Sequence, residues 1–150
     1  MWRTAQPQDD DTIAEMCLAL YREDPASEPG PPPSIRATLA ALREQPSRGR
    51  AVVLETEGRV VAYALLIAFW SNELGGEVCD IDELYVVPEL RNRGYGSSLF
   101  DAIERADIWP ERPVAMALVV NQDNTRARRL YERLGFKSTW VSMVRRPPSR

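Results

Sequence analysis

The feature that most constrains the fold is a run of three strand-like segments joined by short connections. Residues 51–55 and 60–69 flank the turn 56–59, and residues 78–87 follow a Gly-Gly loop and stop at Pro88. Connections this short join antiparallel neighbours. The middle segment is almost entirely apolar, so we expect it to be buried on both faces. The sequence therefore predicts a three-stranded antiparallel unit at the centre of the fold.

Helical periodicity follows this unit. Residues 95–108 carry apolar side chains at helical spacing, and residues 114–120 form the next strand-like segment. Because a helical crossover leads to it, this segment is expected to lie parallel to the strand before the helix. A further helix begins at Asn124 and ends with Gly135 in the C-cap position, and residues 138–144 are predicted to form a last strand.

The first third of the chain predicts a short strand and two helices. After a strand at residues 2–5, Thr12 and Glu15 form a capping box that opens the first helix. Residues 24–33 contain five prolines and are expected to form a loop. Ser34 caps the second helix, which Pro46 ends. The elements together predict an α/β (α+β) chain with a mixed, mostly antiparallel sheet.

Composition limits the available chemistry. A chain of 150 residues with 44% apolar and 27% charged side chains fits one globular domain, residues 1–150. The absence of histidine removes His-dependent triads and His-ligated zinc, and we expect no metal. Cys17 and Cys79 are isolated and are expected to be buried thiols in a reducing cytoplasm. No segment is typical of a signal peptide or a membrane span.

Charge is distributed unevenly along the chain. Residues 1–90 have a net charge of −9, from seven Arg against sixteen acidic residues, whereas residues 91–150 have +6, from twelve basic against six acidic residues. Residues 91–150 are therefore suited to bind an anion, and residues 1–90 to bind a cation. An acidic surface exposed to solvent would explain the negative charge of residues 1–90 equally well. The acidic part argues against a nucleic-acid partner.

The most informative stretch is the turn that joins the strand 78–87 to the next helix. It consists of Arg91-Asn92-Arg93-Gly94-Tyr95-Gly96-Ser97. Free N–H groups at the start of a helix, together with the helix dipole, form an anion site. The two glycines allow the backbone to approach a phosphate, the two arginines add charge, and Ser97 adds a hydroxyl. A pyrophosphate would fit such a turn.

The pattern is specific enough to name a family. A Rossmann fingerprint would need a third glycine where Leu99 stands, and no Gly-Lys-Ser/Thr of a Walker loop is present. The remaining pattern, Arg91-x-x-Gly94-x-Gly96, resembles the signature of the GNAT superfamily of acetyl-CoA-dependent N-acetyltransferases. A second stretch, Asn124-x-x-Ala127-x-x-x-Tyr131 followed by Gly135-Phe136, is similar to another motif of that family. Asn92 departs from the family pattern, in which a glycine is frequent.

The resemblance implies a fold and a cofactor site. The sheet would be splayed at an acetyl-CoA cleft, with helices on both faces. Pantetheine would pair with the backbone of Leu84, Tyr85 and Val86, and the pyrophosphate would bind residues 92–97. Asn124, Ala127 and Tyr131 would face the cofactor; Asn124 and Tyr131 are two turns apart on one stripe. The Tyr131 hydroxyl would protonate the departing thiolate, without a covalent enzyme intermediate.

A primary amine must lose a proton before it attacks, and Asp82 and Glu83 are the candidate bases. Adjacent strand residues face opposite sides, so without a bulge only one of them can reach the cleft. By its position relative to the Arg/Gly turn, Asp82 matches the glutamate that serves as base in spermidine/spermine-type members. A salt bridge to a neighbouring arginine is the alternative role for either carboxylate.

The acceptor side is the least determined part of the prediction. Acidic and aromatic residues together suit a small cationic amine. Those from regions that line the acceptor side in this superfamily are Tyr21, Glu23, Asp24, Glu28, Phe69, Trp70, Ser71, Asn72 and Glu73. Two alternatives remain open: an enzyme that acetylates protein N-termini or lysines, and an acetyl-CoA sensor without catalysis. The chain is also compatible with a homodimer.

Overall fold

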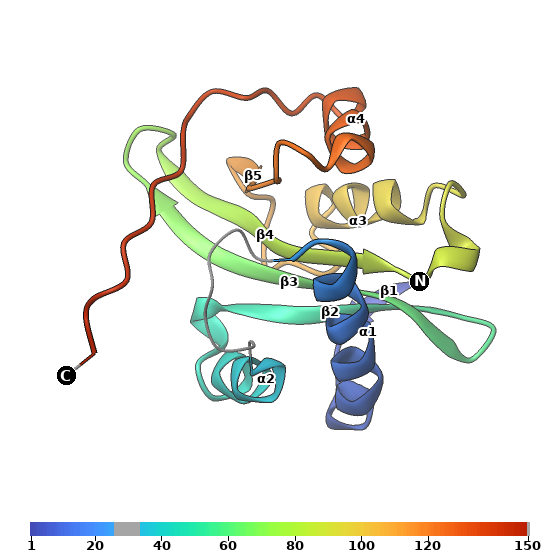
Figure 1. Ribbon diagram of the computed structural model, residues 1–150. Coiled ribbons are helices and arrows are strands. Elements are labelled where there is room, and N and C mark those ends of the chain that lie inside the picture. The colour runs from blue at the N-terminus through green and yellow to red at the C-terminus, as the bar shows by residue number, and fades with distance from the viewer. Residues whose placement is uncertain (26–33, 150) are drawn as a thin grey trace.

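The computed structural model describes residues 1–25 and 34–149, which form one five-stranded sheet between two layers of helices (Figure 1). The strands lie in the order β1-β2-β3-β4-β5. Their bounds are Trp2–Thr4, Gly49–Thr56, Arg59–Ser71, Gly76–Val86 and Ala115–Leu118. Neighbouring strands are antiparallel except β4 and β5, which are parallel. The predicted antiparallel unit and the parallel strand after the crossover are both confirmed.

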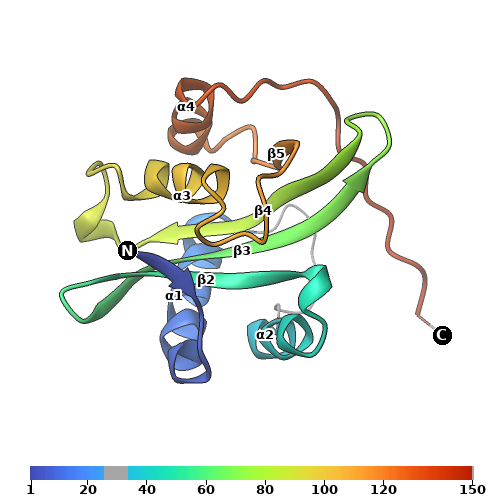
Figure 2. The same ribbon diagram turned by 180° about the vertical axis from the view of Figure 1, so that it is seen from behind.

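Four α-helices cover the sheet. Their bounds are α1 Asp10–Glu23, α2 Ile35–Glu44, α3 Tyr95–Glu104 and α4 Thr125–Arg133. Helices α1 and α2 lie on one face and α3 and α4 on the other, as Figures 1 and 2 show from opposite sides. An apolar cluster fills the space on each face, around Tyr63 and Leu39 beneath α1 and α2 and around Leu66 and Leu99 beneath α3. The mixed sheet with helices on both faces is thus confirmed.

Most predicted helix ends are confirmed. The Ser34 hydroxyl accepts a hydrogen bond from the Ala37 N–H at 3.3 Å. Gly135 has φ 90° after α4, and the Phe136 N–H donates back to the Tyr131 carbonyl at 3.0 Å. This is the glycine C-cap expected from the sequence.

Three expectations about local structure are wrong. Helix α1 begins at Asp10 and not at Thr12, because a 3-10 turn at Pro7–Asp9 leads directly into it. Helix α3 ends at Glu104, before Ala106 with φ 59°, so it is shorter than predicted. Residues 138–144 form no strand, because they pair with no other segment that the structure describes.

The long strand β3 is buried only in part. Residues 61–66 are buried on both faces, as expected, but Phe69 and Trp70 near its end are 57% and 71% exposed. Cys17 and Cys79 are free and buried, as predicted. None of the described helices has the length and apolar character needed to cross a membrane. The proline-rich segment 26–33, which contains Glu28 and most of the predicted loop, lies outside the described residues.

Candidate active site

The site begins where two neighbouring strands part. The ladder between β4 and β5 joins residues 78–81 to residues 115–118 and ends there. Strand β4 continues to Val86, but beyond Ile81 it is paired only with β3 among the described strands. One backbone edge of β4, which includes the predicted pantetheine-binding residues Leu84, Tyr85 and Val86, therefore faces a gap between strands. The predicted splay of the sheet is present.

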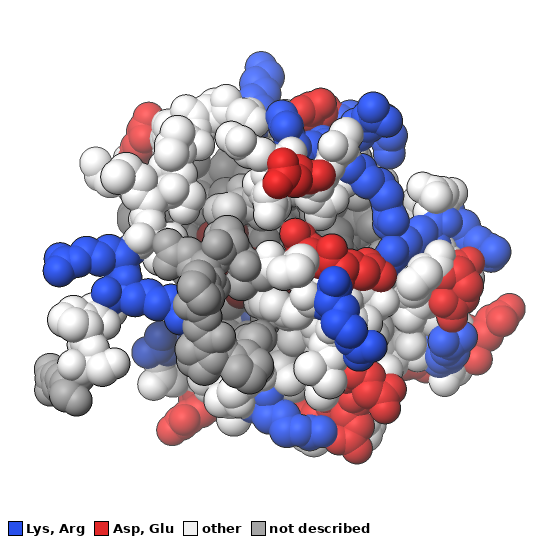
Figure 3. Space-filling model, in the orientation of Figure 1, with Lys and Arg blue, Asp and Glu red and all other residues white. Residues whose placement is uncertain are grey.

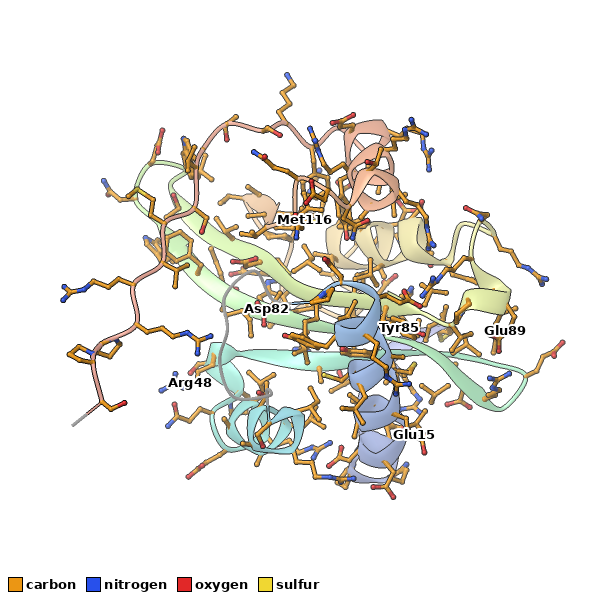
Figure 4. All side chains as sticks on the ribbon, in the orientation of Figure 1. Glu15, Arg48, Asp82, Tyr85, Glu89 and Met116 are labelled. Atoms are coloured by element: carbon orange, nitrogen blue, oxygen red, sulfur yellow. The ribbon has the colours of Figure 1, made fainter. Side chains whose placement is uncertain are left out.

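A β-bulge in β4 decides where the two candidate bases lie. Leu65 of β3 pairs with Glu83 and Leu66 pairs with Ile81, so Asp82 is an extra residue without a partner of its own. The bulge breaks the alternation of side chains. Glu83 consequently contacts α1, and Asp82 also acts on the pKa of Tyr21 in that helix. Glu83 thus lies on the α1 side, with Asp82 next to it in the bulge; Figure 4 labels Asp82 and Tyr85 along β4, and Met116 on β5.

The Glu83 carboxylate is held by three side chains from two elements. The Tyr21 hydroxyl of α1 donates to Oε2 at 2.7 Å, and the Tyr63 hydroxyl of β3 donates to Oε1 at 2.8 Å. The Cys17 thiol lies 3.8 Å from Oε1. Each carboxylate oxygen therefore accepts one phenolic hydrogen bond, which fixes the position of the group. We call Cys17, Tyr21, Tyr63 and Glu83 the Glu83 cluster.

Burial raises the pKa of several side chains around β4. It raises the pKa of Tyr63 and Tyr21 far above the usual range, and the Glu83 charge adds to the effect. Desolvation also raises the pKa of the Asp82 carboxyl, although the residue is exposed at the surface. The pKa of Asp80 is raised by desolvation and then by the charge of Asp82. A carboxyl with a raised pKa is closer to the range in which it can accept a proton.

The Arg/Gly turn has the geometry of an anion site. Gly94, the residue before α3, has φ 79°, and in the part of the chain that the structure describes no side chain caps this helix. A Cβ at Gly94 would meet no atom within 4 Å, and one at Gly96 would meet only Leu130 Cδ2 at 3.6 Å. The space before the uncapped N–H groups is therefore open, which fits a phosphate. Asn92 has φ 63°, a conformation that Asn tolerates in place of the more frequent glycine.

Basic side chains surround this turn. Figure 3 shows blue side chains gathered over α4 and beside the turn that precedes α3. Helix α4 has the sequence TRARRLYER, with four arginines in nine residues. Arg93 of the turn is exposed. Part of the positive charge counted in the second part of the sequence thus lies on α4 and on the turn before α3.

Arg91 points away from this open space. Its Nε donates to the Val86 carbonyl at 2.8 Å, and its Nη2 lies 2.8 Å from Glu23 Oε2. The guanidinium also stacks over the Tyr85 ring, with 5.1 Å to the ring centroid. Arg91 and Glu23, predicted to bind the cofactor and the acceptor respectively, therefore hold each other and tie the turn to α1.

The second motif lies on α4 beside the gap. The Asn124 side chain accepts from the Ala127 N–H at 3.2 Å, which caps the helix, and donates to Asp24 Oδ2 at 3.3 Å. Tyr131 packs edge-on against Phe100 and Phe136, with ring centroids 6.1 and 5.9 Å away. Burial raises the pKa of Tyr131, and the Asp24 charge raises it further. Tyr131 therefore stays protonated at neutral pH.

The residues predicted on the acceptor side do not all meet. Tyr21 joins the Glu83 cluster, but Trp70, Asn72 and Glu73 are exposed around the β3–β4 connection. Trp70 pairs with Glu77, which is six residues before Glu83 and so roughly 20 Å along the strand. The structure therefore does not bring these three residues to the two carboxylates.

Two cavities of about 360 and 430 Å³ lie elsewhere. The first is bounded by α2, β1 and β2, and the second by α1 and the β2–β3 turn. Neither is lined by a predicted site residue. Among the described residues, no group of His, Cys, Asp or Glu side chains is arranged to hold a metal ion.

Sequence reasoning missed Tyr63, and it placed Asp24 on the acceptor side and not beside Asn124. Tyr63 stands within an apolar run, where an aromatic residue is typical of a core, and it is indeed fully buried. Its hydroxyl was the one available signal, because a buried Tyr O–H needs a partner. Asp24 stands at the edge of the proline-rich segment, and only the fold brings it to Asn124.

Known proteins with similar sequence or structure include acetyltransferases. A protein of Methanocaldococcus jannaschii named as an uncharacterised N-acetyltransferase is 37% identical over 101 residues, which are 63% of this chain and 44% of that protein. The chain thus spans less than half of the length of this relative. A possible acetyltransferase from Clostridium difficile 630 has a TM-score of 0.79 at 26% identity, over 100% of this chain and 98% of its own.

A more distant neighbour is the aminoglycoside N-acetyltransferase AAC(6')-Iy in complex with CoA. Its TM-score is 0.72 at 18% identity, and the match covers 99% of this chain and 95% of that one. The model of the acetyltransferase (GNAT) family matches residues 14–136, which is most of the chain. Together with the splayed sheet and the glycine turn before α3, this match establishes that the chain belongs to the GNAT acetyltransferase family.

Proposed function

We propose that this chain transfers the acetyl group of acetyl-CoA to a primary amine by direct attack, without an acyl-enzyme. The observation that carries the proposal is the parting of β4 from β5 beside the uncapped, glycine-lined start of α3. An unpaired strand edge and an anion site are then adjacent, as a long ligand with a pyrophosphate requires. A structural neighbour solved with CoA supports the same ligand.

In this proposal the backbone of the chain holds acetyl-CoA, which supplies an activated thioester. The N–H groups of the turn 92–97 bind the pyrophosphate, and the β4 edge at Leu84, Tyr85 and Val86 pairs with pantetheine. Asn124 and Ala127 contribute from the start of α4. Arg91 supports the turn through Val86 and Glu23, and Arg93 adds charge.

The proton transfers are assigned to Asp82 and Tyr131. Asp82 takes one proton from the acceptor ammonium, and the nitrogen then attacks the thioester carbonyl. As the N–C bond forms and the C–S bond breaks, Tyr131 gives its proton to the sulfur. The second proton that leaves the nitrogen restores Tyr131, so the products are an amide and the free thiol. The raised pKa of Asp82 supports its role as proton acceptor, and the raised pKa of Tyr131 keeps its proton in place until the thiolate forms.

A small cationic amine is the proposed acceptor. Asp80, Asp82 and Glu83 are three carboxylates on one stretch of β4, and α1 covers part of it. Negative charge with aromatic neighbours favours an ammonium group. An enzyme for protein N-termini or lysines, or a sensor without catalysis, remains the alternative.

The proposal extends to the organisation of the protein. Residues 1–150 form one domain, since both apolar clusters pack on the same sheet. A cytoplasmic location agrees with two free buried thiols. A homodimer would cover apolar side chains such as Trp140 and Val141, which are 72% and 87% exposed. Sedimentation velocity tests the dimer, and a monomer at all concentrations would contradict it.

The test of the proposed reaction is thiol release from acetyl-CoA in the presence of polyamines, aminoglycosides, amino acids and basic peptides. Turnover on one class identifies the reaction and the acceptor together. Tyr131→Phe keeps the ring that packs on Phe100 and Phe136, so it should lower turnover while calorimetry shows unchanged CoA binding. CoA binding without turnover on any amine would favour a sensor, and no CoA binding would contradict the proposal altogether.

A further inference from the structure

The Glu83 cluster contains more hydrogen bonding than a general base requires. Three elements converge on one carboxylate: α1 with Cys17 and Tyr21, β3 with Tyr63, and β4 with Glu83 itself. Tyr63 is fully buried, and its ring lies 6.5 Å from that of Tyr85 between centroids. Such a network is costly to bury unless each polar group is satisfied, and here each phenol hydroxyl donates to Glu83.

The bulge places a second carboxylate beside this fixed one. Asp82 has no hydrogen-bond partner among the described residues and is exposed, whereas Glu83 accepts a phenolic hydrogen bond on each oxygen. A carboxylate whose oxygens are fixed in position by hydrogen bonds is suited to bind a cation, and an unpartnered one is suited to accept a proton. The two neighbours thus have different capabilities.

We propose that Tyr21 and Tyr63 are positioning residues that hold the Glu83 carboxylate as the anchor for the acceptor ammonium, while Asp82 takes the proton. This division of roles rests on the proposed amine acetyl transfer and goes beyond it, because the family motifs do not include Tyr63. Oε2 of Glu83 keeps a further lone pair for an N–H donor of the ammonium, whereas Oε1 already accepts from the Tyr63 hydroxyl and the Cys17 thiol. The groups that face the two carboxylates are Cys17 and Tyr21 from α1, Tyr63 from β3 and Asp80 from β4.

The experiment uses the full chain and n-butylamine, which carries only the group that Glu83 is proposed to bind. Four variants are compared with the unsubstituted protein: Tyr63→Phe, Tyr21→Phe, Glu83→Gln and Asp82→Asn. Val53→Ala is the matched control, because Val53 is fully buried and pairs with Tyr63 in the sheet but touches no hydrogen bond of the cluster. It should lower the thermal midpoint without changing the kinetics.

We expect Tyr63→Phe and Tyr21→Phe to raise KM for n-butylamine about tenfold each, with kcat changed little, because each removes one charge-assisted hydrogen bond from the anchor. Glu83→Gln should have a larger effect on KM. The acidic limb of the kcat pH profile should persist in these three variants. Asp82→Asn should instead lower kcat and abolish that limb.

A second readout does not depend on turnover. Carboxyl ¹³C NMR with labelled Asp and Glu should show that n-butylammonium shifts the Glu83 signal, and that Tyr63→Phe weakens this shift at a given amine concentration. The proposal is overturned if the tyrosine variants lower kcat or move its acidic limb, since Glu83 would then be the base. It is equally overturned if n-butylammonium leaves the Glu83 signal unchanged. Binding at Glu83 without thiol release would contradict the proposed function alone.

Discussion

Asn124 at the start of α4 donates a hydrogen bond to Asp24 at the end of α1, with 3.3 Å between Nδ2 and Oδ2. The two residues are 100 positions apart in the sequence, and they connect the helix layers on opposite faces of the sheet. The neighbouring Glu23 makes the corresponding connection to Arg91 in the turn before α3. The end of α1 is thus tied to both elements that are proposed to hold acetyl-CoA.

Substitutions at Asn124 separate helix capping from this connection. Asn124→Ala removes both the cap on Ala127 and the bond to Asp24, and should lower the free energy of unfolding by about 1 kcal/mol or more. Asn124→Asp keeps a capping oxygen but places a second carboxylate against Asp24. We expect near-normal stability and weaker acetyl-CoA binding for Asn124→Asp, measured by chemical denaturation and calorimetry. Equal losses of stability in both variants would show that the bond to Asp24 matters more than the cap.

Local signals in the sequence predicted local structure well. Ser34 and Gly135 were identified by residue type, because a cap needs only the few neighbouring N–H or C=O groups. Residue type alone also led to the wrong choice of Thr12 as the start of α1. Asp9 and Asp10 are equally suitable at a helix start, and a proline precedes them. Residues 138–144 have a strand-like pattern, but a strand also requires a partner, which the pattern cannot specify.

The site was predicted less completely than the fold. Alternation allowed either Asp82 or Glu83 to reach the cleft, and only the structure shows that a bulge at Asp82 breaks this alternation. Glycines at 94 and 96 were recognisable because the backbone itself forms that part of the site. Glu23, which pairs with Arg91, and Tyr21, which bonds Glu83, are each more than 60 residues from their partner, and Tyr63 is 20 residues from Glu83. No local pattern encodes such pairings.

Gly96→Ala should separate fold from ligand binding. Gly96 lies in the first turn of α3, and a Cβ there would only touch Leu130 Cδ2 at an ordinary 3.6 Å. Because Ala is the better helix former, the free energy of unfolding should rise by up to about 1 kcal/mol. The added methyl group occupies space proposed for the pyrophosphate, so acetyl-CoA affinity should fall roughly tenfold. Unchanged affinity in calorimetry would contradict the phosphate assignment.

Arg91 and Arg93 should differ in what they contribute to binding. Arg91 is engaged by Val86 and Glu23, so Arg91→Ala should weaken acetyl-CoA and acetyl-pantetheine alike, by about fivefold for a loss near 1 kcal/mol. Glu23→Gln should act in the same direction. Arg93→Ala should weaken acetyl-CoA only, because acetyl-pantetheine lacks the pyrophosphate, and the loss should diminish at high salt. Selective loss of acetyl-CoA in Arg91→Ala would instead make Arg91 a direct phosphate ligand.

The start of α1 predicts how stability depends on pH. Asp9 is 5% exposed and accepts hydrogen bonds from Arg3 at 2.8 and 3.0 Å and from the Gln6 N–H at 2.7 Å. The Arg3 hydrogen bonds are the main cause that lowers the pKa of the Asp9 carboxyl. The folded protein therefore binds this proton less readily than the unfolded chain, whose Asp pKa is about 3.9. The stabilisation that ionised Asp9 gives the folded protein is complete above the unfolded pKa. It is lost as the pH falls through the pKa of Asp9 in the folded protein.

Asp9→Asn should accordingly lower the free energy of unfolding at pH 7 by about 1.5–3 kcal/mol, and the gap from the unsubstituted protein should narrow below about pH 4. Asp11→Asn is the matched control, because Asp11 also pairs with an arginine, Arg36 at 2.6 Å, but is 87% exposed. Its effect should stay within about 0.5 kcal/mol at every pH, since exposed pairs contribute little. Urea denaturation from pH 3 to pH 8 measures both variants. A gap for Asp9→Asn that is independent of pH would mean that the side chain contributes through packing and not through its charge.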